Sequence, residues 1–107
     1  MEIQATITYD SYVVLRNILD DCRVLRLTHY DYLKLMDITL DLERQATRKE
    51  RVADVVSLHL NNQDYLCIRE CILAVERTGT TTRASSEVQT LAMEMDWSRG
   101  LGDALIG

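Results

Sequence analysis

The chain contains 107 residues, of which 47% are hydrophobic and 27% charged, and this composition excludes the low-hydrophobicity, high-charge class of intrinsically disordered proteins. The length predicts a single domain spanning residues 1–107, because most domains contain about 100–150 residues. Seventeen acidic residues against 12 Lys and Arg give a net charge of −5, which disfavours a protein that coats nucleic acid by charge alone.

Neither a secretion signal nor a membrane span is predicted. Residues 1–10 carry acidic side chains and lack an apolar run of signal-peptide length. No stretch approaches the roughly 18 consecutive apolar residues that a membrane-spanning helix needs. We therefore expect a cytoplasmic protein, in the host cytoplasm if the chain is viral.

The beginning of the chain has the periodicity of a strand. Ile3, Ala5 and Ile7 alternate with polar residues, a period of two that favours a short strand over residues 1–9, with an irregular arm as the alternative. Because a lone strand cannot satisfy its own backbone groups, it would have to pair with another strand or with a second copy of the chain.

The remainder has helical periodicity and no proline, with three of its four glycines at or beyond Gly100. A polar loop is expected at 78–86, before a last helix that ends near Trp97, and residues 98–107 form an apolar, glycine-containing tail. The other predicted helices are 11–25, 29–46, 48–60 and 63–77, with one uninterrupted helix over 29–60 as the alternative to the second and third. These elements predict a mainly α fold, a small four- to five-helix bundle that includes one short N-terminal β-strand if residues 1–9 form one.

The helix predicted at 29–46 carries two apolar stripes on opposite sides. Such a helix either is the central element of the bundle, or meets the core with one stripe and another subunit or a partner with the other. The first stripe consists of Leu33, Met36 and Leu40, and the second of Leu35, Ile38, Leu42 and Ala46.

We assign partner binding to part of the second stripe together with the apolar C-terminal segment. Four of the five tyrosines cluster at the starts of the first two helices, where they form either a recognition patch or a half-buried rim of the bundle. The predicted partner-binding residues are Leu35, Ile38, Leu42, Trp97, Leu101, Leu105 and Ile106.

A basic ridge supports an alternative function. Arg44, Arg48 and Arg51 have the i, i+4, i+7 spacing that places them on one face of a continuous helix, where they would contact nucleic acid. A helix-turn-helix interpretation of the segment that follows is weak, because Asp64 comes directly after the polar residues that would read bases.

No arrangement in the sequence predicts an enzyme. His29 and His59 are the only histidines, and neither is accompanied by a nucleophile motif. Asp37 and Asp41 stand one helical turn apart on the expected polar edge of a helix, as solvated carboxylates commonly do. A glycine-rich phosphate loop is absent, because no glycine precedes Gly79.

The cysteines predict neither a metal site nor a disulfide framework, and no cofactor is expected. Cys22, Cys67 and Cys71 are an odd number, so we expect reduced thiols packed in the core. Cys67 and Cys71 are four residues apart on a predicted helix, whereas structural zinc sites usually take paired ligands from a tight turn.

The sequence therefore favours a non-enzymatic protein-interaction module, a regulatory adaptor or inhibitor that binds another protein or a second copy of itself. A compact chain of this type is at home in a phage or mobile element, as an inhibitor of a host enzyme. The alternatives are a nucleic-acid-binding regulator that uses the arginine ridge, and a structural subunit of a symmetric homo-oligomer.

Overall fold

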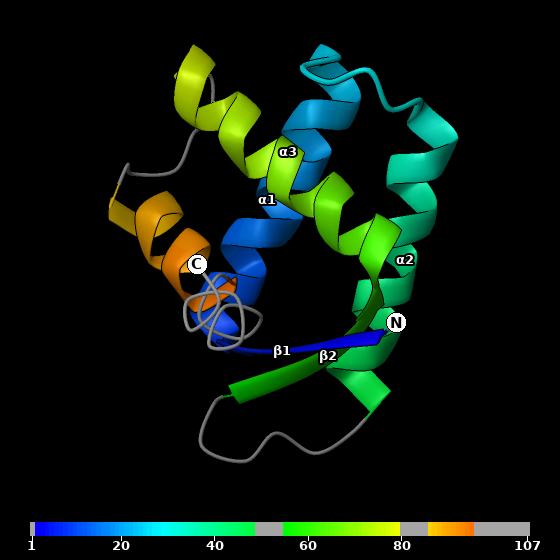
Figure 1. Cartoon of the computed structure of the whole chain (residues 1–107), viewed down its shortest axis with the longest axis vertical. Coiled ribbons are helices and arrows are strands. Elements are labelled where there is room, and N and C mark those ends of the chain that lie inside the picture. The colour runs from blue at the N-terminus through cyan, green and yellow to red at the C-terminus, as the bar shows by residue number, and fades with distance from the viewer. Residues whose placement is uncertain (1, 49–54, 80–85, 96–107) are drawn as a thin grey trace.

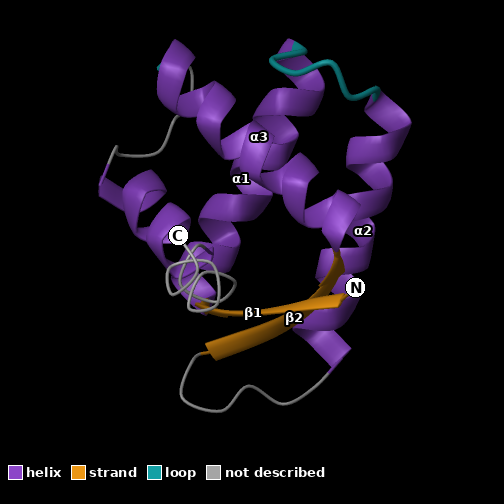
Figure 2. Ribbon diagram, in the orientation of Figure 1, coloured by secondary structure: helices purple, strands orange, loops and turns teal. Residues whose placement is uncertain are grey.

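The computed structural model describes residues 2–48, 55–79 and 86–95. The described chain is mainly helical and carries one two-stranded sheet, which confirms the expected fold class and the N-terminal strand (Figures 1 and 2). The elements are β1 (Glu2–Thr8), α1 (Tyr9–Leu25), α2 (Tyr32–Arg48), β2 (Val55–Asn61), α3 (Asn62–Thr78) and a further helical segment at 86–95.

Capping residues set the ends of the helices. The Thr8 hydroxyl accepts from Ser11 N at 3.1 Å and begins α1 two residues before the predicted start. Asp31 accepts from Lys34 N at 2.7 Å, so α2 begins at Tyr32 and not near residue 29. α3 begins after Asn61 and ends at Gly79, which adopts a left-handed conformation with φ of 63° and donates its N–H to Val75 O.

The prediction of a helix over residues 48–60 is wrong for its second half. Residues 55–61 form β2, which pairs antiparallel with β1 and places Ile3 opposite Leu60, Ala5 opposite Leu58 and Ile7 opposite Val56. The reason is a period of two: the apolar side chains of β2 at even positions are buried, while those of Ser57 and His59 are exposed. The strand at the N-terminus therefore finds its partner within the chain.

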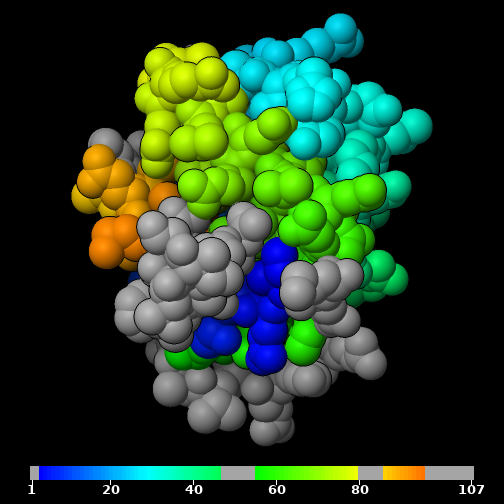
Figure 3. All heavy atoms as spheres, in the orientation of Figure 1, coloured from blue at the N-terminus to red at the C-terminus, as the bar shows by residue number. Residues whose placement is uncertain are grey.

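A single core lies between the sheet and the helices. α1 contacts both α2 and α3, the strands close one end of the helices, and segment 86–95 lies beside the start of α1 (Figure 1). Figure 3 shows α3 covering much of one face of the molecule, with β1 below it. The largest fully buried side chains come from every element: Ile7, Leu15, Ile18, Leu19, Leu35, Leu42, Leu58, Leu60, Tyr65, Ile68, Val75 and Leu91.

Three side chains tie the periphery to this core. The Gln45 amide on α2 donates to His59 O at 3.0 Å and accepts from His59 N at 2.6 Å. It therefore satisfies both backbone groups of one residue on the outer edge of β2, as a neighbouring strand would. The Glu94 carboxylate accepts from Thr8 N at 2.8 Å and from the Ser11 hydroxyl, and thereby joins segment 86–95 to the start of α1. Tyr65 donates its hydroxyl to Met95 O at 3.4 Å, which fastens the same segment to α3.

Asp21 on α1 is the one described carboxylate with a buried oxygen that lacks a hydrogen-bond partner within residues 2–48, 55–79 and 86–95. Burial raises the pKa of the Asp21 carboxyl above its ordinary value, and the neighbouring charge of Asp20 raises it further. The folded chain therefore holds the Asp21 proton more tightly than the unfolded chain does. It follows that ionisation of Asp21 destabilises the fold as the pH rises through this range.

We expect Asp21→Asn to raise the urea midpoint of unfolding at pH 7, because the amide carries no charge that burial penalises. The gain should shrink as the pH falls and vanish below the unfolded pKa of about 3.9, where Asp21 is protonated in both states. The matched control is Asp37→Asn on α2, which removes an exposed carboxylate and should bring no such gain. A gain for Asp21→Asn that is the same at pH 3 and pH 7 would contradict this assignment.

Candidate functional site

The predicted partner-binding residues on α2 lie inside the chain. Leu35, Ile38 and Leu42 expose 0, 3 and 2% of their surface, and they belong to the hydrophobic core with Ala46. They cannot contact a partner unless the fold opens, so the assignment of the partner surface to this stripe needs correction. The C-terminal residues of the same prediction, Trp97, Leu101, Leu105 and Ile106, lie outside the described residues.

The other stripe of α2 is the exposed one. Leu33 exposes 72% of its surface and Leu40 exposes 50%, while Met36 between them is half-buried. Of the two alternatives for this helix, α2 buries one stripe in the core and exposes the other, with the buried and exposed stripes exchanged relative to the assignment made from the sequence. Leu33 and Leu40 are two helical turns apart and therefore lie on the same face of α2.

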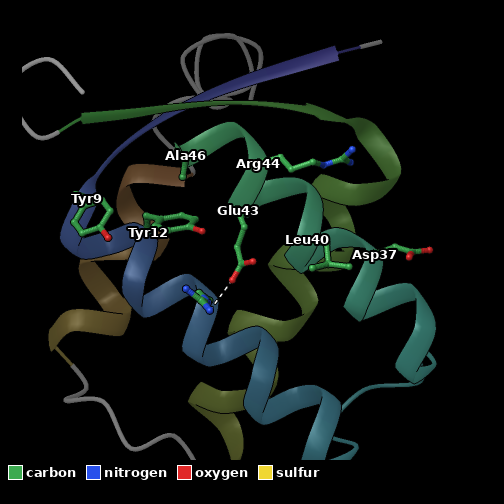
Figure 4. A pocket seen from close by; sticks show the side chains of 8 residues that line it. Tyr9, Tyr12, Asp37, Leu40, Glu43, Arg44 and Ala46 are labelled. Carbon is green, nitrogen blue, oxygen red and sulfur yellow. Dashed lines mark ion pairs between the residues drawn. The ribbon is translucent and has the colours of Figure 1, made fainter. Parts of the chain in front are cut away.

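The exposed stripe continues into a pocket of about 850 Å³ between α1 and α2 (Figure 4). The two helices run in opposite directions, because Arg16 reaches Glu43 while Arg23, seven residues later, reaches Met36, seven residues earlier. Leu40 belongs to both the stripe and the pocket. The residues that line the pocket are Tyr9, Tyr12, Arg16, Asp37, Leu40, Glu43, Arg44 and Ala46.

Two tyrosines form one end of the pocket. The rings of Tyr9 and Tyr12 lie with their centroids 5.8 Å apart and their planes tilted by 34°, a favourable arrangement for an aromatic pair. Tyr12 is buried, and burial together with the charge of Glu43 raises the pKa of its hydroxyl. The hydroxyl therefore stays protonated at neutral pH, and Tyr9, which is only partly buried, is the tyrosine of this pair that a partner can reach.

An ion pair crosses the middle of the pocket. Arg16 on α1 and Glu43 on α2 approach to 2.6 Å, and Figure 4 shows the Glu43 side chain extended across the gap toward α1. More than half of the Arg16 side chain is exposed, so the pair adds at most about 1 kcal/mol to the fold. Its charges remain available to orient a partner.

Arg23 organises the opposite end, beside Met36. Its guanidinium lies 5.2 Å from the centroid of the Tyr32 ring, donates to Met36 Sδ at 3.2 Å and pairs with Asp20 at 3.0 Å. The apolar stripe is thereby held against α1. We use the name α1–α2 face for the surface made by Tyr9, Arg16, Leu33, Met36, Leu40 and Glu43.

The chemistry of the α1–α2 face is that of recognition. Apolar and aromatic side chains supply contact area, and a pair of opposite charges supplies orientation. Among the described residues, no group of three or more His, Cys, Asp or Glu side chains is placed to hold a metal ion. The two histidines lie apart, with His29 Nδ1 at 3.7 Å from Glu70 and the backbone of His59 held by Gln45.

The arginine ridge is only partly described. Arg44 is exposed and pairs with Asp41 at 3.0 Å, so part of its charge is already neutralised within α2. Arg48 is the last residue of α2, and Arg51 lies outside the described residues. Asp41 also accepts from Gln45 at 2.9 Å. The sequence placed this carboxylate on a solvated edge of the helix, and in the structure it takes part in local hydrogen bonds.

No helix in the described part of the chain is long and apolar enough to cross a membrane. Comparisons with protein-family models, with curated proteins and with solved structures give no match. The α1–α2 face is therefore the feature from which we infer a function.

Proposed function

We propose that this chain is a non-enzymatic protein-interaction module, a cytoplasmic regulatory adaptor or inhibitor, that binds another protein through the α1–α2 face. The observation that carries the proposal is the exposure of Leu33 and Leu40 beside a pocket lined by Tyr9 and Tyr12. Covering such side chains removes apolar surface from water, and tyrosine adds contact area at little entropic cost. A compact chain of this type would suit an inhibitor of a host enzyme, encoded by a phage or mobile element.

The shape and charge of the face favour an amphipathic helix as its occupant. Two antiparallel helices border the pocket, and the 17 residues of α2 extend for about 25 Å at 1.5 Å per residue, which matches a partner helix of about five turns. Leu33 near one end of the α1–α2 face, Leu40 near its middle and Tyr9 at the other end would receive its apolar stripe. The Arg16–Glu43 pair requires a polar residue near the middle of that stripe.

The proposal is tested with the double variant Leu33→Asp and Leu40→Asp, captured from its native cells and compared by quantitative mass spectrometry with the unmodified chain. We expect capture of the specific partner to fall at least about tenfold, because loss of one good anchor costs more than about 1.4 kcal/mol. Both leucines are exposed, so the helical circular dichroism should be unchanged.

The matched control is Leu66→Asp and Leu73→Asp on α3, where the two leucines expose 40 and 44% of their surface. This control adds the same charge to a different face and should leave capture intact. Equal loss in both double variants, or retention in the α2 variant, would refute the proposal. If the purified chain forms a discrete oligomer and the α2 variant does not, the occupant of the face is instead a second copy of the chain.

A further inference from the structure

Three thiols meet in the core between α1 and α3. Cys22 lies in the last part of α1, and Cys67 and Cys71 lie one turn apart on α3; each is at most 1% exposed. The Cys22 thiol donates to the backbone oxygen of Cys71 at 3.6 Å. The Cys71 thiol influences the protonation of both Cys22 and Cys67, so Cys71 is the central member of the cluster.

The three thiols differ in how firmly they hold their protons. Interaction with Cys71 lowers the pKa of Cys22 and of Cys67, against the opposing effect of burial. Interaction with these two thiols, together with burial, raises the pKa of Cys71, which therefore keeps its proton.

Helix geometry excludes one of the three possible pairs, and a contact between α1 and α3 favours another. Residues four apart on a helix have Cβ atoms about 5–6 Å apart, whereas a disulfide requires about 3.5–4.5 Å, so Cys67 and Cys71 cannot be bridged without unwinding α3. Cys22 and Cys71 belong to different helices, whose approach already brings the Cys22 sulfur against the Cys71 backbone. We propose that Cys22 and Cys71 are an oxidation site, at which a hydroperoxide forms a disulfide that fastens α1 to α3.

The reaction balances in two steps. The Cys22 sulfur attacks the terminal oxygen of the hydroperoxide, the O–O bond breaks, and an alcohol leaves as Cys22 becomes a sulfenic acid. The Cys71 sulfur then attacks the Cys22 sulfur, the S–O bond breaks, and water leaves with the Cys71 proton. Two thiols lose two electrons in total, and the hydroperoxide is reduced by the same two electrons.

The position of Cys22 provides access to this buried pair. α1 ends at Leu25, one turn beyond Cys22, and the Val24 and Leu25 side chains in this last turn are exposed. The last turn of a helix opens more readily than its middle, which exposes Cys22 while the rest of α1 stays folded. Oxidation is therefore expected to be slow and limited by this local opening.

The test uses the full wild-type chain, treated with dilute hydrogen peroxide, alkylated under denaturing conditions and digested with trypsin. The arginines separate the three thiols, because Cys22 falls in fragment 17–23, Cys67 in 52–69 and Cys71 in 70–77. We expect fragments 17–23 and 70–77 to be joined within one chain, with a mass about 2 Da below their sum, while Cys67 is alkylated. The disulfide should also raise the thermal midpoint by on the order of 10 °C, reversibly with dithiothreitol.

Variants sharpen this result without being essential to it. Cys67→Ser should retain the link and the reversible rise in the midpoint, whereas Cys71→Ser should lose both. The proposal is overturned if all three thiols are alkylated after peroxide treatment, if fragment 52–69 is joined to 70–77, or if the link forms only between two chains.

Discussion

Leu35→Ala is expected to lower the free energy of unfolding by about 2–5 kcal/mol, whereas Leu33→Ala on the same helix should change it by less than about 0.5 kcal/mol. Leu35 is fully buried in the core, so its truncation removes apolar contacts and leaves a cavity. Leu33 is 72% exposed and loses little, while alanine favours the helix at least as well as leucine. Urea unfolding followed by circular dichroism measures both changes.

The two variants also separate stability from binding. Leu33→Ala should weaken capture of the proposed partner while leaving the urea midpoint unchanged, because Leu33 belongs to the α1–α2 face and not to the core. Leu35→Ala should lower the urea midpoint. It should reduce capture of the partner only to the extent that it increases the fraction of unfolded chain. Similar losses of stability in the two variants would contradict the placement of the stripes.

The sequence predicted that α2 has two apolar stripes, but the stripe that was assigned to a partner is the buried one. Both contain leucines at helical spacing, so periodicity alone treats them as equivalent. One signal in the sequence was that the buried stripe is the longer of the two. It includes Thr39 and extends to the small residue Ala46. The Thr39 hydroxyl returns to Leu35 O at 2.8 Å, which lets this polar side chain lie in the core.

β2 was missed for a different reason. The absence of Pro and Gly before residue 79 favoured continuous helix, and the polar sequence at 44–51 was interpreted as a helix junction. The alternation of Val56, Leu58 and Leu60 with Ser57 and His59 was the competing signal, and it matches the alternation already recognised in β1. Because a strand at the N-terminus requires a partner, a search for a second segment of period two would have found β2.

The ion pair at the centre of the α1–α2 face could not be predicted from spacing. Arg16 and Glu43 are 27 positions apart, and their meeting depends on the register at which α1 and α2 pack. That register depends on the end of α1, where the left-handed Arg26 turns the chain and Leu27 N donates to Cys22 O at 3.3 Å. The tyrosines at the starts of the first two helices were interpreted as either a recognition patch or a half-buried rim, and the structure places Tyr9 and Tyr12 in the lining of the pocket.

Glu94→Ala should destabilise segment 86–95 selectively, by about 1.5–3 kcal/mol. The Glu94 carboxylate accepts from Thr8 N at 2.8 Å, from the Thr8 hydroxyl at 3.5 Å and from the Ser11 hydroxyl, and alanine replaces none of these bonds. Thr8 is also the residue that caps α1, so one carboxylate fixes the segment to a helix start and to the end of β1. Amide hydrogen exchange measures the effect directly, because residues 86–95 should lose protection before α1 and α3 do.

Met93→Ala is the matched control, since Met93 is exposed and precedes Glu94 in the same segment. Its change in helix propensity is small, so protection over 86–95 should be retained. The buried Val88, Leu91 and Met95 still hold the segment in both variants, and Tyr65 still donates to Met95 O. If the Glu94 variant exchanges no faster over 86–95 than the Met93 variant, apolar packing alone places this segment, and the carboxylate bridge contributes nothing to its position.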